Sequence, residues 1–300
     1  MILQGSASSE PRLTVVLACD GALDHIQDRI AAIARACDDI PSEIIVAHAR
    51  DARVELPASS GIAVREVLTE SPLVPVLWGA GIATAHGGIV ALTTTQFRVD
   101  APWARELLAP FDDADVVGAG GSMQVGGAAD MLTRAVFLIR YSEHMARPGA
   151  PPPRDIAGDN AAYRRDAVLR VYPDVASGFW EVDVHRLMRA HGGRIAHVPG
   201  AVAEFTPELT VSEMLANRFV HGSHFGAYRV SALRWPRWRA VAVTPLVPVV
   251  LIARILGRVR RGGQPLGSAL ALLPAMLPLL AAWAAGEARG AISGPRVGER

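Results

Sequence analysis

Short apolar runs alternate with segments of helical spacing along the first half of the chain. Four partly β-branched runs have the character of buried parallel strands, at residues 12–18, 43–47, 64–68 and 89–93. After the first run, Ile26, Ile30 and Ile33 recur at the spacing of one helix face, and a second helix is expected at 78–86. This alternation predicts an α/β fold with an open, mostly parallel sheet and helices on both faces.

The second half of the chain continues the pattern less regularly. A further strand is predicted at 115–121, and a proline-rich stretch at 147–154 is expected to form a loop. Later helices are predicted at 164–170, 181–191 and 212–229, the last with Ser212 as its N-cap and Glu213 in its first turn. Open sheets of this kind bind ligands at the carboxyl ends of their strands.

The C-terminal part changes character and carries a membrane signal. An arginine–tryptophan cluster at 234–239, suited to a lipid headgroup layer, precedes two apolar runs at 240–253 and 266–285. The first is short for a span, which needs ~20 residues, and the second contains Pro274 and Pro278. A crossing hairpin, shallow insertion and core helices of a soluble domain are the alternatives. Shallow or re-entrant insertion is favoured, because a hairpin would carry the basic loop between the runs across the membrane.

Composition narrows the classes of protein. The 300 residues carry a net charge of +1 and are half hydrophobic, which allows a large core and gives no sign of a nucleic-acid partner. All thirty basic residues are arginine, so a single arginine is weak evidence of specific recognition. Cys19 and Cys37 lack a histidine at ligand spacing, which predicts buried, reduced thiols. The first ten residues have no secretory signal pattern.

Candidate chemistry is concentrated in two neighbouring segments, 158–165 and 178–186. The second places Glu181 and Asp183 directly after the aromatic pair Phe179–Trp180 and ahead of a predicted helix. A carboxylate beside an aromatic wall can take a proton from a sugar hydroxyl while the wall stacks on the ring. The carboxylates are also favourable at a helix N-terminus without any catalytic role, and the aromatic rings also suit ordinary packing.

In residue pattern and position these two segments resemble the family 2 glycosyltransferases. The resemblance covers roughly the first 230 residues. The resemblance implies a GT-A-type glycosyltransferase domain at 1–232, followed by a membrane-associated helical tail at 233–300. It implies inverting transfer, with Asp183 as the base and Glu181 as the close rival. The residues expected to contact the acceptor are Gly158, Asp159, Asn160, Phe179 and Trp180. A glycine there permits close backbone approach, while Asp159 and Asn160 are equally suited to pinning the turn.

The donor half departs from the family pattern. The family's fourth strand ends in acidic residues that hold a divalent metal, whereas this chain has 93–96, Thr-Thr-Thr-Gln. Hydroxyls and an amide are poor ligands for a hard dication. No metal ligand is therefore assigned, and Mg²⁺ or Mn²⁺ is left open as a cofactor. The residues expected near the donor are Asp20, Asp51, Thr94, Thr95, Gln96 and Arg98.

A late helix is expected to contribute cations. By resemblance Arg218 contacts the diphosphate, and His221 shares its helix face at i+3. A polar face turned to solvent or headgroups is the alternative. Three accounts of the donor half stay open: metal-independent transfer with Arg98, Arg50 or His221 meeting the phosphate charge, a lipid phosphosugar donor, or loss of catalysis.

The expected protein is therefore a glycosyltransferase at the cytoplasmic face of the cell membrane. It would take a nucleotide sugar and a glycan or lipid-linked acceptor in cell-envelope polysaccharide synthesis. The alternative is a catalytically inactive scaffold that keeps the fold and the acceptor groove. Another doubly wound nucleotide enzyme is disfavoured, because no G-x-G-x-x-G follows the first strand and a P-loop lysine is missing.

Overall fold

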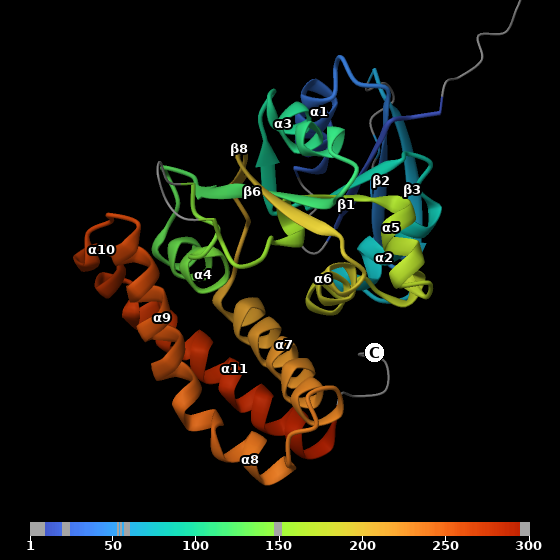
Figure 1. The fold of residues 1–300 in the computed structure, drawn as a ribbon. Helices are drawn as coiled ribbons and strands as arrows, with labels where there is room; N and C mark the ends of the chain where they lie inside the picture. Colours follow the sequence, from blue (N-terminus) through green and yellow to red (C-terminus); the bar gives the residue numbers. More distant parts are fainter. Residues whose placement is uncertain are drawn as a thin grey trace, which may run out of the picture. The chain divides into compact units, whose positions relative to one another are not determined.

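The computed structural model describes residues 10–19, 25–52, 54, 56, 61–146 and 152–294. The chain divides into two units. The sheet unit comprises Met1–Gln124 and Pro152–Phe205, and the helical unit comprises Val125–Pro151 and Thr206–Arg300. Both are traced in colour in Figure 1. The division differs from the predicted boundary at 232/233, because the helix of Val211–Ser231 packs along the C-terminal helix and belongs with it.

The described residues of the sheet unit form one eight-stranded sheet in the order β3-β2-β1-β4-β7-β6-β8-β5. The strands are β1 (Leu13–Ala18), β2 (Ser42–Ala49), β3 (Ala63–Thr69), β4 (Ile89–Thr94), β5 (Phe97–Val99), β6 (Val116–Val125), β7 (Ala161–Arg164) and β8 (Arg194–Phe205). Strands β3, β2, β1 and β4 are parallel, whereas β7 pairs antiparallel with β4 and β6, and β5 with β8. The predicted open α/β sheet is confirmed, as a mixed sheet whose parallel half is the half that the apolar runs predicted.

Helices pack against this sheet. They are α1 (Ile26–Ala36), α2 (Val74–Thr84), α3 (Trp103–Leu108), α5 (Arg165–Val171) and α6 (Glu181–Ala190). Helix α2 begins earlier than the predicted 78–86, with a proline in its first turn, where no backbone N–H is needed. Cys19 and Cys37 are buried thiols, as predicted.

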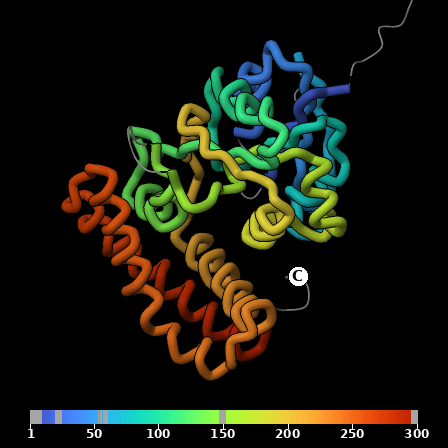
Figure 2. The backbone as a smooth tube through the Cα atoms, in the orientation of Figure 1, coloured from blue at the N-terminus to red at the C-terminus, as the bar shows by residue number. Residues whose placement is uncertain are grey.

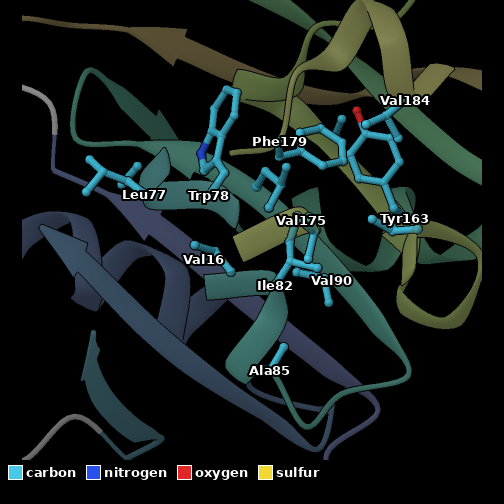
Figure 3. Packing of buried hydrophobic residues seen from close by; sticks show 14 of the residues in the cluster. Val16, Leu77, Trp78, Ile82, Ala85, Val90, Tyr163, Val175, Phe179 and Val184 are labelled. Atoms are coloured by element: carbon cyan, nitrogen blue, oxygen red, sulfur yellow. The ribbon is translucent and has the colours of Figure 1, made fainter. Parts of the chain in front are cut away.

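One hydrophobic cluster fixes α2 and α6 to the sheet. It joins Val16 of β1 and Val90 of β4 to Trp78 of α2. It also includes Tyr163 of β7 and Phe179, which lies just before α6. Figure 3 shows the rings of Tyr163 and Phe179 side by side, and their centroids lie 5.0 Å apart. Burial of such rings is the main source of stability in a core, so this packing also positions the turn that leads into α6.

A buried carboxylate ties the amino ends of the parallel strands together. Glu43 of β2 is only 4% exposed. It accepts hydrogen bonds from Thr14 Oγ1 and the His86 backbone N–H, both at 2.8 Å, and from Arg65 Nε at 2.9 Å. Burial acts to raise its pKa, but the bonds from Arg65, His86 and Thr14 outweigh burial and lower it to about 2.

We expect Glu43→Gln to lower the free energy of unfolding by about 1–3 kcal/mol at pH 7, because charge-assisted bonds are lost inside the fold. The depressed pKa means that this stabilisation is present above pH 4.5 and is lost as the pH falls toward 2. Urea denaturation at several pH values measures both effects. Glu70→Gln, which breaks an exposed pair with Arg50, is the matched control and should change stability by less than about 0.5 kcal/mol. Equal losses in the two variants would contradict the assignment.

The helical unit contains α4 (Met131–Tyr141), α7 (Val211–Ser231), α8 (Arg237–Ala242), α9 (Val247–Arg261), α10 (Leu266–Ala271) and α11 (Leu273–Ser293). Helix α7 begins with a capping box in which Thr210 is the N-cap and Glu213 returns the hydrogen bond. The prediction of Ser212 as N-cap was wrong by two positions, because Thr210 supplies the side-chain oxygen that the first turn needs.

Glycines let α7 and α11 lie in direct backbone contact, side by side in Figure 2. A Cβ at Gly222 would lie 2.2 Å from Trp283 O, and one at Gly226 would lie 2.0 Å from Glu287 O. A Cβ at Gly290 of α11 would in turn lie 1.8 Å from Ser223 O. Small residues four apart on both helices are therefore required by the packing, as in many helix pairs of membrane proteins.

One described segment is long and apolar enough to cross a membrane. It is Arg237–Arg261, 25 residues that contain an 18-residue window with a mean hydropathy of 2.1, and 22% of that window is buried. The predicted second run, 266–285, lies in α10 and α11 and does not meet the same criteria. The spanning candidate therefore comprises the first predicted run, 240–253, and the helical residues on either side of it, across a 3₁₀ turn at Thr244–Leu246.

Candidate functional site

The carboxyl end of β4 is the centre of the candidate site. Strand β7 runs antiparallel to β4 with Leu92 opposite Ala161, so the 3₁₀ turn Gly158–Asn160 lies beyond Leu92, alongside the end of β4. Trp78 Nε1 donates to Thr93 O at 3.1 Å and so links α2 to the same place. The register of one short antiparallel strand thus brings the predicted acceptor turn to the predicted donor strand.

Glu181 is the first residue of α6 and contacts this turn. Its Oε1 accepts a hydrogen bond from the backbone N–H of Gly158. A Cβ at Gly158 would lie 2.5 Å from that oxygen and 2.9 Å from Cζ3 of Trp78, so the close approach requires glycine. The N-cap residue of α6, Trp180, makes no capping side-chain hydrogen bond. The Glu181 side chain is directed to the Gly158 turn.

The surroundings of Glu181 favour its neutral form. Burial and the nearby carboxylate of Asp159 raise its pKa to about 7, while His185 and the Gly158 N–H act in the opposite direction. Asp159 is itself only 7% exposed. A carboxyl group that titrates near neutral pH beside a second carboxylate is suited to accepting a proton from a substrate.

A chain of buried hydrogen bonds lies behind Glu181. Tyr163 Oη and His185 Nε2 are 2.8 Å apart, and His185 Nδ1 is 2.8 Å from Asp155 Oδ1, which also binds Arg189. Burial raises the pKa of Tyr163, so its hydroxyl donates to Nε2, and Nδ1–H then donates to Asp155. His185 lies one turn along α6 from Glu181, a spacing at which it could orient that carboxylate. Its hydrogen bonds go instead to Tyr163 and Asp155, so its contribution to Glu181 is electrostatic.

Asp183 has different surroundings. Its side chain is 28% exposed, and Oδ1 lies 3.5 Å from Arg186 one turn along α6. The two acidic residues of the segment are therefore distinguished by their environment: Glu181 contacts the Gly158 turn, and Asp183 lies beside an arginine.

The other predicted acceptor residues divide between site and core. Phe179 is fully buried against Tyr163, so its ring packs in the core and has no face left for a sugar. Trp180 is half-buried, and its indole folds back toward Gly178, whose φ of 145° allows the turn. Asn160 is fully buried and pins the turn, with Nδ2 donating to the carbonyls of Ser122 and Ala201 and Oδ1 accepting from Trp103. Of this set, Gly158 and Asp159 lie closest to Glu181.

The predicted donor residues do not form one group. Thr94, Thr95 and Gln96 are buried at the end of β4, where the Gln96 N–H donates to Thr94 Oγ1. Asp51 is exposed in the turn after β2, and Asp20 lies outside the described residues. Arg98 is exposed on β5, at the far edge of the sheet from β3, where it lines a cavity of about 260 Å³.

The end of β4 does not fit a divalent metal. It offers hydroxyls and an amide, whereas a hard dication requires anionic oxygens. Within the part of the chain that the structure describes, three or more His, Cys, Asp or Glu side chains nowhere gather closely enough to hold a metal ion. The hydroxyl of Thr93 is buried without a hydrogen-bond partner among the described residues.

Arg218 and His221 lie on α7 in the helical unit. Arg218 is buried, with its guanidinium 5.2 Å from the centre of the Trp283 ring on α11, and His221 follows one turn later. Sequence reasoning missed Trp78, Tyr163 and Asp155 as parts of the site. Only the adjacency of Tyr163 and Asp155 to the Gly158 turn could have indicated them.

No protein-family model and no curated protein matches the chain. Several solved structures do. Glucosyl-3-phosphoglycerate synthase from Mycobacterium tuberculosis, in complex with Mn²⁺, UDP and phosphoglyceric acid, is 14% identical with a TM-score of 0.43 over 71% of this chain and 76% of its own. A complex of that enzyme with UDP-glucose gives 14% and 0.45 over 75% and 81%. A structure described as a mycobacterial protein gives 16% and 0.44 over 71% and 73%.

Proposed function

We propose that the protein is an inverting glycosyltransferase that moves a sugar from a nucleotide sugar to a hydroxyl of a glycan or lipid-linked acceptor. The observation that carries this proposal is Glu181, a largely buried carboxyl group with a pKa of about 7 beside the glycine turn at the carboxyl end of β4. Parallel sheets bind their ligands at this end.

The proposed reaction needs one base. The ionised carboxylate accepts the proton of the acceptor hydroxyl as its oxygen attacks the anomeric carbon of the donor. The bond from that carbon to the phosphate oxygen breaks, and the nucleoside diphosphate leaves from the opposite face. The family resemblance favours Asp183 as the base, whereas the environment favours Glu181, because its pKa lies near the working pH. We assign the role to Glu181.

The proposed donor site is the end of β4. Thr94, Thr95 and Gln96 are hydrogen-bonding groups for uncharged sugar or ribose hydroxyls. Since this strand end does not fit a dication, no step of the proposed reaction is routed through a metal.

The proposed location is the cytoplasmic face of the cell membrane, with shallow insertion of the helical unit. All the large hydrophobic side chains that are exposed in the described chain, except Leu68 and Val182, belong to this unit. They include Trp238, which is 73% exposed beside Arg237 and Arg239. Such an apolar surface with interleaved arginine and tryptophan suits a headgroup layer.

Calorimetric titration of the full chain with a panel of nucleotide sugars tests the proposed function. We expect one donor to bind with a dissociation constant below about 1 mM, the range of ordinary substrates, and with unchanged affinity when Mn²⁺ is added. The matching nucleoside without its diphosphate and sugar is the control and should bind more weakly. If none of the donors binds, the protein is better described as a non-catalytic scaffold. The replacement of the family's acidic residues by Thr and Gln at the end of β4 would then mark a lost donor site.

A further inference from the structure

A buried arginine of the helical unit has a side-chain donor that meets no acceptor among the described residues. Arg218 is only 8% exposed, and its Nε is buried with no hydrogen-bond partner among the described residues. No described side chain forms a hydrogen bond or ion pair with the guanidinium, and its recorded contact is the face of Trp283. A guanidinium has five N–H donors, and leaving even the Nε–H donor unmet in the interior is costly.

A second arginine, Arg140 of α4, adds positive charge near Arg218. Burial and Arg140 lower the pKa of Arg218 to about 10, against the opposite effect of Tyr141. Burial, Arg218, Arg140 and His224 lower the pKa of His221 to about 3, so His221 is neutral at pH 7. Positive groups from α4 and α7 therefore converge on one place, and an anion bound there would relieve their repulsion.

The carboxylates of the unit that could neutralise Arg218 are paired with other arginines. Glu143 binds Arg258, and Glu287 lies 2.8 Å from Arg229. The electrostatic neighbours that shift the pKa of Arg218 include no carboxylate of the described chain. The missing counter-charge is therefore best supplied by a ligand.

We propose that Arg218, together with Arg140 and His221, binds the phosphate head of a lipid whose chain lies along the exposed apolar side chains of the helical unit. A phosphate monoester offers several oxygens to the N–H groups of a guanidinium, and arginine binds it in a bidentate manner. The exposed hydrophobic surface of the same unit, which includes Phe225 on α7, favours a lipid over a free anion. This inference rests on the proposed function, and narrows its lipid-linked partner to a lipid phosphate.

Flotation of the full-length protein with phosphatidylcholine vesicles tests the proposal, with either phosphatidic acid or phosphatidylglycerol added. Both lipids are anionic, but only phosphatidic acid presents a terminal phosphate. We expect tighter binding to phosphatidic acid, and a loss of about 10- to 100-fold in Arg218→Gln, the size expected when hydrogen bonds to a charged group are removed. Arg254→Gln, an exposed arginine on α9, is the matched control and should lose no more than about fivefold.

Thermal unfolding separates a ligand site from a structural role. Without lipid, Arg218→Gln and Arg218→Met should be at least as stable as the wild type, because a buried unpaired charge is removed. Phosphatidic acid in detergent micelles should raise the Tm of the wild type and not that of either variant. Unfolding of both variants without lipid would show that the arginine serves packing on Trp283, and would overturn the proposal.

Three further outcomes would overturn it. They are equal binding losses in the Arg218 and Arg254 variants, unchanged binding in the Arg218 variants, and a Tm increase by inorganic phosphate equal to that by phosphatidic acid, which would indicate a free-anion site. The donor titration on the same preparations keeps the two proposals apart. If no nucleotide sugar binds but phosphatidic acid still raises the Tm, the glycosyltransferase proposal is rejected. If a nucleotide sugar binds but phosphatidic acid has no effect, only the lipid-phosphate site is rejected.

Discussion

Glu181→Gln will reduce kcat/KM for sugar transfer by about 10²- to 10⁴-fold, the usual contribution of a general base. The amide keeps the size of the side chain and cannot accept the proton. Asp183→Asn, two residues along the same helix, is the matched control, and its loss should be much smaller, because Asp183 lies beside Arg186. The measurement is the initial rate with the donor found by titration.

The pH profile gives this prediction a second readout. Because burial and Asp159 raise the pKa of Glu181 to about 7, kcat/KM of the wild type should rise with pH through 7 as the base ionises. The residual activity of Glu181→Gln should lack this step. If Asp183→Asn removes the activity while Glu181→Gln keeps it, the family resemblance identifies the base and the assignment to Glu181 is wrong.

The raised pKa of Glu181 also affects the stability of the fold, which should fall with rising pH while the activity increases. The native state holds a proton on Glu181 between about pH 4.5 and 7, where the unfolded chain has released it. The stability that this proton confers is present below pH 4.5 and is lost as the pH rises through 7. Denaturation of Glu181→Gln should therefore lack this decline, which is expected to be about 1–3 kcal/mol in the wild type.

Gly290→Ala should destabilise the helical unit by about 1–3 kcal/mol or more, because the new methyl group would lie 1.8 Å from Ser223 O on α7 and the helices would have to separate. In a helix, alanine is more favourable than glycine by about 1 kcal/mol. The expected loss of stability would therefore occur despite the higher helix propensity of alanine. Thermal unfolding in detergent, followed by circular dichroism, measures the change.

Gly257→Ala in α9 is the control for this prediction. The nearest atom to its added methyl group is Arg261 Nη1 at 3.9 Å, so only the helix preference acts and the variant should be equally or more stable. A Gly290→Ala variant as stable as Gly257→Ala would mean that α7 and α11 are not in backbone contact.

Strands β1, β2 and β4 were predictable because each contains a continuous apolar run that is buried on both faces. Strand β7 was missed, since Ala161–Arg164 is too short to show a period and was assigned to a turn and the start of a helix. Its antiparallel register is nevertheless what brings Gly158 to the end of β4.

The sequence indicated which segments form the candidate site, but it did not indicate the contacts that their side chains make. The acidic–aromatic pattern identified Glu181 and Asp183, but only packing distinguishes the carboxylate at the Gly158 turn from the one beside Arg186. Sugar stacking and ordinary packing were both open for Phe179, which is in the core. Sequence spacing alone does not report which side of a turn is buried. The hydrogen bonds of His185 likewise depend on residues distant in the sequence.

Helix α4 has a consequence for dissecting the molecule. It lies between β6 and β7 in the chain, yet its buried face, with Phe137 and Tyr141, belongs to the helical unit and contacts α11. A chain shortened at Phe205 would keep α4 and lose its packing partners, leaving an apolar helix exposed beside an otherwise intact sheet unit. The two halves are interleaved, so neither can be obtained by trimming one end alone.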